Sequence, residues 1–195
     1  IYAKGYIKPY LGRKSPAQIS LHYCGLGVLY LSMLLVVTLR DGFSFLFAWE
    51  VMTLSSFVLM LFDAERREVR RAALSYLILM HVGFLFLLAG FVTLYASGLP
   101  ASFDALALYG EQGGNIIPLF IVFLIGFGMK AGIFPLHVWL PEAHPAAPAH
   151  ISAFMSGVMI KTGVYGVMRV VSCFDSHLFA IGLIVLCIGA VTGLW

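Results

Sequence analysis

Charged residues are scarce in this sequence. They make up 11% of its 195 residues, while hydrophobic residues make up 61%, and the mean hydropathy is +0.97. A soluble domain of this size is normally about one quarter charged. The shortage of charge therefore excludes an ordinary soluble domain and predicts a membrane protein.

Cysteines and cofactor-binding motifs are also nearly absent. The three cysteines lie far apart, in or beside apolar segments, and none forms a C-x-x-C pair: Cys24, Cys173 and Cys187. Neither an iron–sulfur nor a zinc site is predicted, and we expect small, buried thiols. The sequence contains no G-x-G-x-x-G fingerprint and no P-loop. We therefore expect no cofactor in this chain, so that any redox centre of its complex would lie on partner subunits.

A starting methionine and a signal peptide are missing. The sequence begins at Ile1 and ends at Trp195 inside an apolar run. These features predict an internal fragment of a longer protein. Because we find no domain boundary and no internal repeat, we expect residues 1–195 to form a single transmembrane domain.

Long apolar runs are abundant. A membrane-spanning helix needs about 20 mostly apolar residues. A sixth run begins near His177, and five complete runs precede it: 20–39, 43–62, 73–97, 116–136 and 150–171. We predict an all-α, polytopic transmembrane helical bundle. The one long connection, 98–114, contains apolar residues that permit an amphipathic segment: Phe103, Leu106 and Leu108.

The basic residues predict an orientation. Four precede the first run and four lie between the second and third, so alternating spans place all eight on one side: Lys4, Lys8, Arg13, Lys14, Arg66, Arg67, Arg70 and Arg71. The opposite side receives only Arg40 and Arg169. By the positive-inside rule, the N-terminal end and the 63–72 loop are cytoplasmic, in a cell membrane. The net charge of +3 is then mostly a topology signal, and no nucleic-acid partner is expected.

Three ionisable residues fall inside predicted spans: Glu50, Lys130 and Lys161. Lys161 has about ten residues on either side, which at 1.5 Å per residue places it near the membrane midplane. An ionisable group there costs a few kcal/mol, so a functional role is the default interpretation. Lys161 has no acid of its own in this sequence, and a lysine without a counter-charge in an apolar place exchanges its proton readily. Glu50 and Lys130 could instead be an ion pair that only fixes packing. We favour proton transfer for the three.

The sequence around Lys130 predicts a discontinuous helix. Three glycines lie within 126–132, and Pro135 follows. Glycine and proline at this density weaken or break a helix, and broken membrane helices line buried or wet cavities. Gly128 and Gly132 also form a small-xxx-small pair suited to close helix packing, and both interpretations can hold together. We expect 135–148, with its four prolines, to be a non-helical re-entry or cytoplasmic turn.

Histidines are weaker candidates. His81 lies in the third predicted span, where it could relay protons near neutral pH or simply donate one structural hydrogen bond. The other candidates show neither H-x-x-x-H nor H-E-x-x-H spacing, so no metal site is expected: His137, His144 and His150.

Two stretches resemble a known family. The run FAWEVMTLSS at 47–56 is similar to the glutamate-bearing helix of the antiporter-like subunits of complex I, a family that includes Mrp-type antiporters and membrane arms of group 4 hydrogenases. The run GFGMKAGIFPLHVWLPEAHPAAPAHISAFMSGVMIKTGVYGVMR at 126–169 extends the resemblance, with both lysines in register. Within the family, residues 143–166 are most similar to the antiporter-like membrane component of hydrogenase-4 and its formate hydrogenlyase counterpart.

The resemblance implies roles for these residues. Glu50 and Lys130 would form an ion pair whose making and breaking controls proton release, Lys161 would be the central proton carrier, and His81 matches no family motif. The implied function is proton translocation by a non-redox subunit of a hydrogenase or NADH:quinone oxidoreductase complex, with other membrane subunits and a peripheral redox arm as partners. The alternatives are sodium/proton antiport of the Mrp type, a non-transporting scaffold, and a quinone- or flavin-binding subunit, for which no site is visible.

Overall fold

The described residues of the computed structural model, 5, 8, 12, 14–174 and 178–194, are almost entirely helical. Three long helices come first: α2 Pro16–Thr38, α3 Gly42–Met60 and α4 Arg67–Ala96. The first begins in a capping box, because the Ser15 hydroxyl accepts from the Gln18 amide while the Gln18 side chain accepts from the Ser15 amide. The second begins at Asp41, whose carboxylate accepts from the amide of Ser44 at 2.8 Å.

The second half contains shorter helical pieces. After the short α5 Ala105–Glu111 in the connection 98–114, the chain forms a broken span: α6 Ile116–Ala131, a 3-10 turn Leu136–Trp139 and α7 Leu140–Ala146. A continuous rod follows at 149–171: α8 Ala149–Phe154, a π-helical segment Met155–Met159 and α9 Ile160–Val171. The final helix is α10 Leu178–Leu194. The predicted start of the last run, His177, lies outside the described residues, as do Lys4, Arg13 and Trp195.

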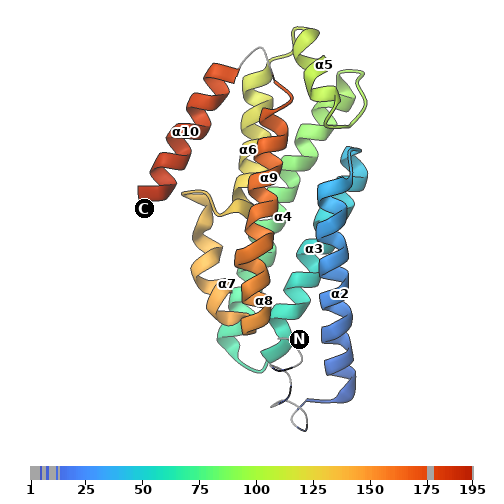
Figure 1. Ribbon diagram of the computed structural model, residues 1–195, viewed down its shortest axis with the longest axis vertical. Coiled ribbons are helices and arrows are strands. Elements are labelled where there is room, and N and C mark those ends of the chain that lie inside the picture. The colour runs from blue at the N-terminus through green and yellow to red at the C-terminus, as the bar shows by residue number, and fades with distance from the viewer. Residues whose placement is uncertain (1–4, 6–7, 9–11, 13, 175–177, 195) are drawn as a thin grey trace.

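Figure 1 shows α2, α3, α4, α6 and α9 running along the long axis of the molecule, with α10 at one side. In this bundle α2 packs on α3, α4 packs on both α3 and α6, and α9 packs on α6. Among the described residues, five segments are long and apolar enough to cross a membrane: Pro16–Thr38, Gly42–Asp63, Arg67–Ala96, Ile116–Ala146 and Ala149–Val171. The prediction of an all-α, multi-pass membrane bundle is confirmed.

Aromatic rings form the core between α3, α4 and α6. The Phe91 and Phe103 centroids are 5.1 Å apart at 88°, and those of Trp49 and Phe127 are 5.4 Å apart at 78°. Such edge-to-face pairs at 4.5–7 Å contribute beyond their buried area. Phe103 comes from the 98–114 connection and is 1% exposed, so this connection is anchored to the core.

The two ends of the bundle are fastened by basic side chains. At one end, Lys14 donates to Glu65 at 2.8 Å and ties the start of α2 to the turn between α3 and α4. At the other end, Arg169 donates to the Leu39 carbonyl at 2.6 Å and lies 3.9 Å from the centroid of the Phe103 ring. We call the end with Lys14 and Arg66 the basic end.

Two local expectations were wrong. The segment 135–148 is mostly helical: Pro141 stands in the first turn of α7, where a missing N–H costs nothing. Pro145 stands near the end of α7 and removes only the bond from its own position to the Pro141 carbonyl, while the Ala147 amide still donates to the Ala143 carbonyl at 3.1 Å. The cysteines are not buried either. Cys24 and Cys187 are exposed, since they occupy helix faces that the described residues leave uncovered, and Cys173 is only partly buried.

Candidate functional site

Lys130 occupies the break in the fourth span. The helix α6 ends one residue later, at Ala131, because Gly132 adopts a left-handed conformation with φ +69° that favours glycine. The chain then resumes as the 3-10 turn and α7, displaced sideways from the end of α6 in Figure 1. The predicted discontinuous helix is therefore confirmed, and it places the Lys130 side chain, 1% exposed, inside the bundle.

The Lys130 ammonium group is surrounded by hydroxyl groups and aromatic rings. Its Nζ atom donates to the Thr53 hydroxyl at 2.8 Å and to the Tyr76 hydroxyl at 3.4 Å. It also lies 5.4 Å from the Trp49 ring centroid and 5.7 Å from that of Tyr76, within the range of cation–π attraction. Helices α3 and α4 supply all of these partners.

The hydroxyl groups form a network with assigned directions. The Ser56 hydroxyl donates to the Thr53 carbonyl at 2.8 Å, so its oxygen accepts from the Tyr76 hydroxyl at 2.7 Å. The Tyr76 oxygen is then left to accept from Lys130. Because the network takes only two N–H groups, both the ammonium form of lysine, with three, and the neutral amine, with two, satisfy it. The site can hold Lys130 in either protonation state.

Glu50 pairs with His81. Its Oε2 atom lies 3.3 Å from the His81 Nε2 atom. Among the ion pairs of the described residues, none joins Glu50 to Lys130, so the direct pair implied by the family resemblance is not formed in this structure. The other carboxylate oxygen, Oε1, is buried and makes no hydrogen bond to the described residues.

His81 lies between two acceptors. Its Nδ1 atom is 2.9 Å from the Leu77 carbonyl, which can only accept, so Nδ1 donates to it, while the Nε2 atom faces the Glu50 carboxylate. Glu50 and Thr53 are three residues apart on one face of α3, so this pair lies about one helical turn from Lys130.

Lys161 stands apart from this cluster. It is exposed on α9, near the middle of the rod 149–171, and lines an apolar pocket of about 300 Å³ with residues of α2 and the rod, including Tyr30, Phe154 and Tyr165. The neighbouring Gly163 faces α6, where a Cβ atom would lie 2.5 Å from the Ala131 nitrogen. The structure thus packs α9 closely on the end of α6 while Lys161 points away from it.

Several features of the site were missed by the sequence analysis. The π-helical segment Met155–Met159 ends one residue before α9 begins, and such segments are frequent at functional sites. Thr53 and Ser56 follow Glu50 by three and six residues on α3. This spacing predicts a polar helix face and could have indicated the hydroxyl network that binds Lys130. No pattern in the sequence marks His22, which makes a buried contact with His150 at 2.7 Å.

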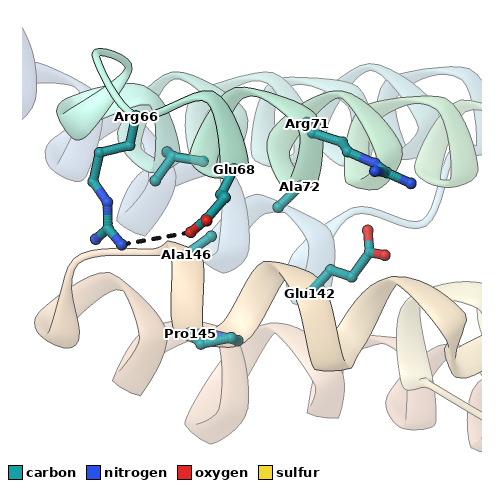
Figure 2. A pocket seen from close by; sticks show the side chains of 8 residues that line it. Arg66, Glu68, Arg71, Ala72, Glu142, Pro145 and Ala146 are labelled. Carbon is teal, nitrogen blue, oxygen red and sulfur yellow. Dashed lines mark ion pairs between the residues drawn. The ribbon is translucent and has the colours of Figure 1, made fainter.

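A charged hollow of about 380 Å³ lies at the basic end, between the start of α4 and α7. Figure 2 shows Arg71 and Glu142 on opposite sides of it, with Arg66 paired to Glu68 at 3.6 Å. Within the described part of the chain, no group of three or more His, Cys, Asp or Glu residues is placed to hold a metal ion.

Comparisons with known proteins identify the family. The family model described as NADH:quinone oxidoreductase/Mrp antiporter, TM, matches residues 40–195. An uncharacterised protein of Mycobacterium tuberculosis is 37% identical over 200 residues, covering 100% of this chain and 29% of that protein. Hydrogenase-4 component B of Escherichia coli K12 is 30% identical over 197 residues, again covering 100% and 29%.

A solved structure is similar as well. The membrane-bound sulfane sulfur reductase, an archaeal respiratory membrane complex, contains a chain that matches 84% of this chain with a TM-score of 0.74 and 29% identity, over 28% of its own length. The chain therefore spans less than a third of the length of these relatives. It belongs to the family of NADH:quinone oxidoreductase and Mrp antiporter membrane subunits.

Proposed function

We propose that this chain carries part of a proton-translocation route in a redox-driven membrane complex, with Glu50, His81, Lys130 and Lys161 as its proton-transfer residues. The observation that supports this most strongly is the placement of Lys130. A buried lysine whose hydroxyl partners fit both its charged and its neutral form can gain and lose a proton without breaking its hydrogen bonds to Thr53 and Tyr76. A purely structural residue has no need of that property.

Glu50 is the switch in this proposal. In the structure it binds His81, while two N–H groups of Lys130 are held by Thr53 and Tyr76. A third N–H of the ammonium form is available to the Glu50 Oε1 atom after a side-chain rotation. The attraction between the two charges at about 4 Å and an effective dielectric near 20 is roughly 4 kcal/mol. That energy corresponds to roughly a thousandfold change in the equilibrium of proton release, and water in the site would reduce it.

A cycle follows from this exchange. With Glu50 on Lys130, the ammonium form is stabilised and the lysine holds a proton. When His81 takes a proton and draws Glu50 away, Lys130 loses its counter-charge and releases a proton toward Lys161. Lys161 then acts as the next carrier. Lys161 lies on the face of α9 that points away from α6 and Lys130. This step therefore runs around the rod 149–171 or through it.

The setting of this chain is also a proposal. Similarity to a hydrogenase-4 component and to a chain of a respiratory complex supports a non-redox subunit of a hydrogenase or NADH:quinone oxidoreductase type of complex, with other membrane subunits and a peripheral redox arm as partners. The abundance of arginine at the basic end supports a cell membrane with that end in the cytoplasm.

A second candidate is sodium/proton antiport of the Mrp type, because the family description includes Mrp antiporters. The Glu50 carboxylate is the group that could attract a sodium ion, but Lys130 beside it would repel one when charged. A non-transporting scaffold is the third possibility. It gives no reason for a buried lysine, because apolar side chains pack a membrane bundle at lower cost.

The test uses the full-length protein in its complex, reconstituted in sealed vesicles. Glu50→Gln keeps the shape of the side chain and removes the switch, and Glu111→Gln, an exposed acid on α5, is the matched control. We expect Glu50→Gln to lower the number of protons moved per electron, while Glu111→Gln does not. Proton movement that requires sodium and continues without electron flow would favour antiport. An unchanged ratio and rate in Glu50→Gln would favour the scaffold.

A further inference from the structure

Two buried histidines from distant parts of the sequence meet near the basic end. His22 on α2 and His150 at the start of α8 bring their Nε2 atoms to 2.7 Å, and each residue is 3% exposed. We propose that this pair is a second proton-transfer site, which carries protons from the solution at the basic end toward Lys161. The inference rests on the proposed function, because it adds an uptake step to it.

The geometry of the pair suits transfer. The ring centroids are 4.9 Å apart and the ring planes meet at 71°, so an N–H group of one ring can point at the lone pair of the other. One Nε2 atom must carry a hydrogen and the other must not. When a proton binds Nδ1 of the donor ring, its Nε2–H bond breaks, a new N–H bond forms on the partner, and the partner releases its Nδ1 proton. One proton enters and one leaves, without any oxidant or reductant.

The pair lies just beneath the charged surface of the basic end. The Phe62 ring covers His22 with a centroid distance of 4.5 Å, and the Lys14 ammonium group lies 5.6 Å from the centroid of that ring. Lys14 is itself held by Asp63 at 3.7 Å and Glu65 at 2.8 Å. One aromatic ring therefore separates the histidines from a cluster of fixed charges, and a small displacement of Phe62 would admit water.

The route inward from the pair follows the rod. On the other side of α8, the His144 ring hydrogen-bonds the Ser152 hydroxyl, which lies two residues after His150 and faces away from His22. The rod then leads through the π-helical segment to Lys161. His150 and Lys161 are eleven residues apart, or roughly 16 Å along the rod at 1.5 Å per residue, a distance that water molecules must help to bridge.

This second input accounts for the separation of the two lysines. Lys130 and its hydroxyl network lie among α3, α4 and α6, whereas the histidine pair joins α2 to the rod that bears Lys161. Lys161 lines a pocket whose walls include α2 residues such as Tyr30 and Met33. A proton taken up between α2 and α8 therefore reaches Lys161 along the face of the rod that Lys161 already occupies, without passing Lys130.

The competing explanation is a static clamp between α2 and α8. Glutamine distinguishes the two, because its amide can hydrogen-bond across the same gap but cannot accept and release a proton. The variants are His22→Gln and His150→Gln in the full-length protein within its complex, reconstituted in vesicles. Ser32→Ala is the control, since it removes another buried hydrogen bond of α2, from the Ser32 hydroxyl to the Leu29 carbonyl at 2.8 Å, and cannot affect proton exchange.

We expect both glutamine variants to assemble and to reduce coupled proton movement at least about tenfold, a lower bound for losing a positioned proton-transfer group, while Ser32→Ala pumps normally. The comparison variant Lys130→Met separates the two proposals. If Lys130→Met abolishes pumping and both glutamine variants pump at the wild-type rate, the histidine inference is overturned and the proposed function stands. If Lys130→Met also pumps normally, the proposed function fails.

A measurement on the unmodified complex covers the case in which the glutamine variants do not assemble. In complex labelled with nitrogen-15 histidine, coupling across the N–H···N bond identifies the pair without any variant. A proton relay predicts that the hydrogen of this N–H···N bond is replaced by solvent deuterium within a few turnovers of the complex, because each transfer renews it. A hydrogen that stays unexchanged through many turnovers would overturn the inference.

Discussion

Replacing Gly163 with alanine tests the close packing of the Lys161 rod against the broken span. A Cβ atom at this position would lie 2.5 Å from the Ala131 nitrogen, 2.8 Å from the Phe127 carbonyl oxygen and 2.9 Å from the Ala131 Cα. All three are backbone atoms at the end of α6, so no side chain can move aside. Ordinary contact at about 3.4 Å or more requires α9 to move by roughly 1 Å, and overpacking of this kind costs about 1–3 kcal/mol.

The matched control is Gly157→Ala on the same rod, where a Cβ atom would meet nothing within 4 Å. Alanine is favoured over glycine in a helix by about 1 kcal/mol, so this variant should be as stable as the wild type or more so. Thermal unfolding of the purified full-length protein measures both. We expect a lower midpoint for Gly163→Ala and an equal or higher midpoint for Gly157→Ala. If both variants change the midpoint in the same direction by the same amount, α9 does not approach α6 as described.

Three further variants test other contacts. Thr53→Val keeps the shape of the side chain but removes the 2.8 Å hydrogen bond from Lys130, which contributes about 1.5–3 kcal/mol when the donor is charged. The variant should slow proton movement at least about tenfold in vesicles. A wild-type rate would contradict the role of the hydroxyl network. His81→Gln leaves Glu50 without a partner that can be protonated, so proton movement should fall while complex assembly, measured by subunit content, stays normal; full pumping would remove His81 from the route. The Lys14 side chain, through its hydrogen bond and charge, lowers the pKa of Glu65, so the pair stabilises the folded chain above the ordinary Glu pKa. This stabilisation is lost as the pH falls and Glu65 is protonated. The difference in unfolding midpoint between wild type and Lys14→Met should therefore vanish in acid, and a constant difference would refute the pairing.

The sequence was sufficient to predict the spans and the broken helix, because each depends on local physical chemistry. Apolar runs of sufficient length form helices in a membrane, because their backbone groups must be hydrogen-bonded within the segment. Glycine and proline near Lys130 end the helix there independently of its tertiary contacts. Boundaries were less accurate. Helix α4 begins at Arg67 instead of residue 73, since arginine is a good helix former and hydropathy marks only the apolar part of a helix.

The partners across helices could not be read in the same way. The contact of Glu50 with His81 depends on the rotation of α3 against α4, and the contact of His22 with His150 joins residues 128 positions apart. Neither contact corresponds to a regular residue spacing that the sequence alone could show. The helical character of α7 was hidden because its prolines suggested a turn, although the first turn of a helix accommodates proline well.

The most direct test of the central claim is the number of protons moved per electron by the full-length complex carrying Lys130→Met. Methionine fills a similar volume without a charge, so packing in the bundle is retained and the proton site is removed. If Lys130 is a proton-transfer site, the ratio falls, or pumping and turnover collapse together, in complexes that assemble normally. An unchanged ratio at an unchanged rate would contradict the account.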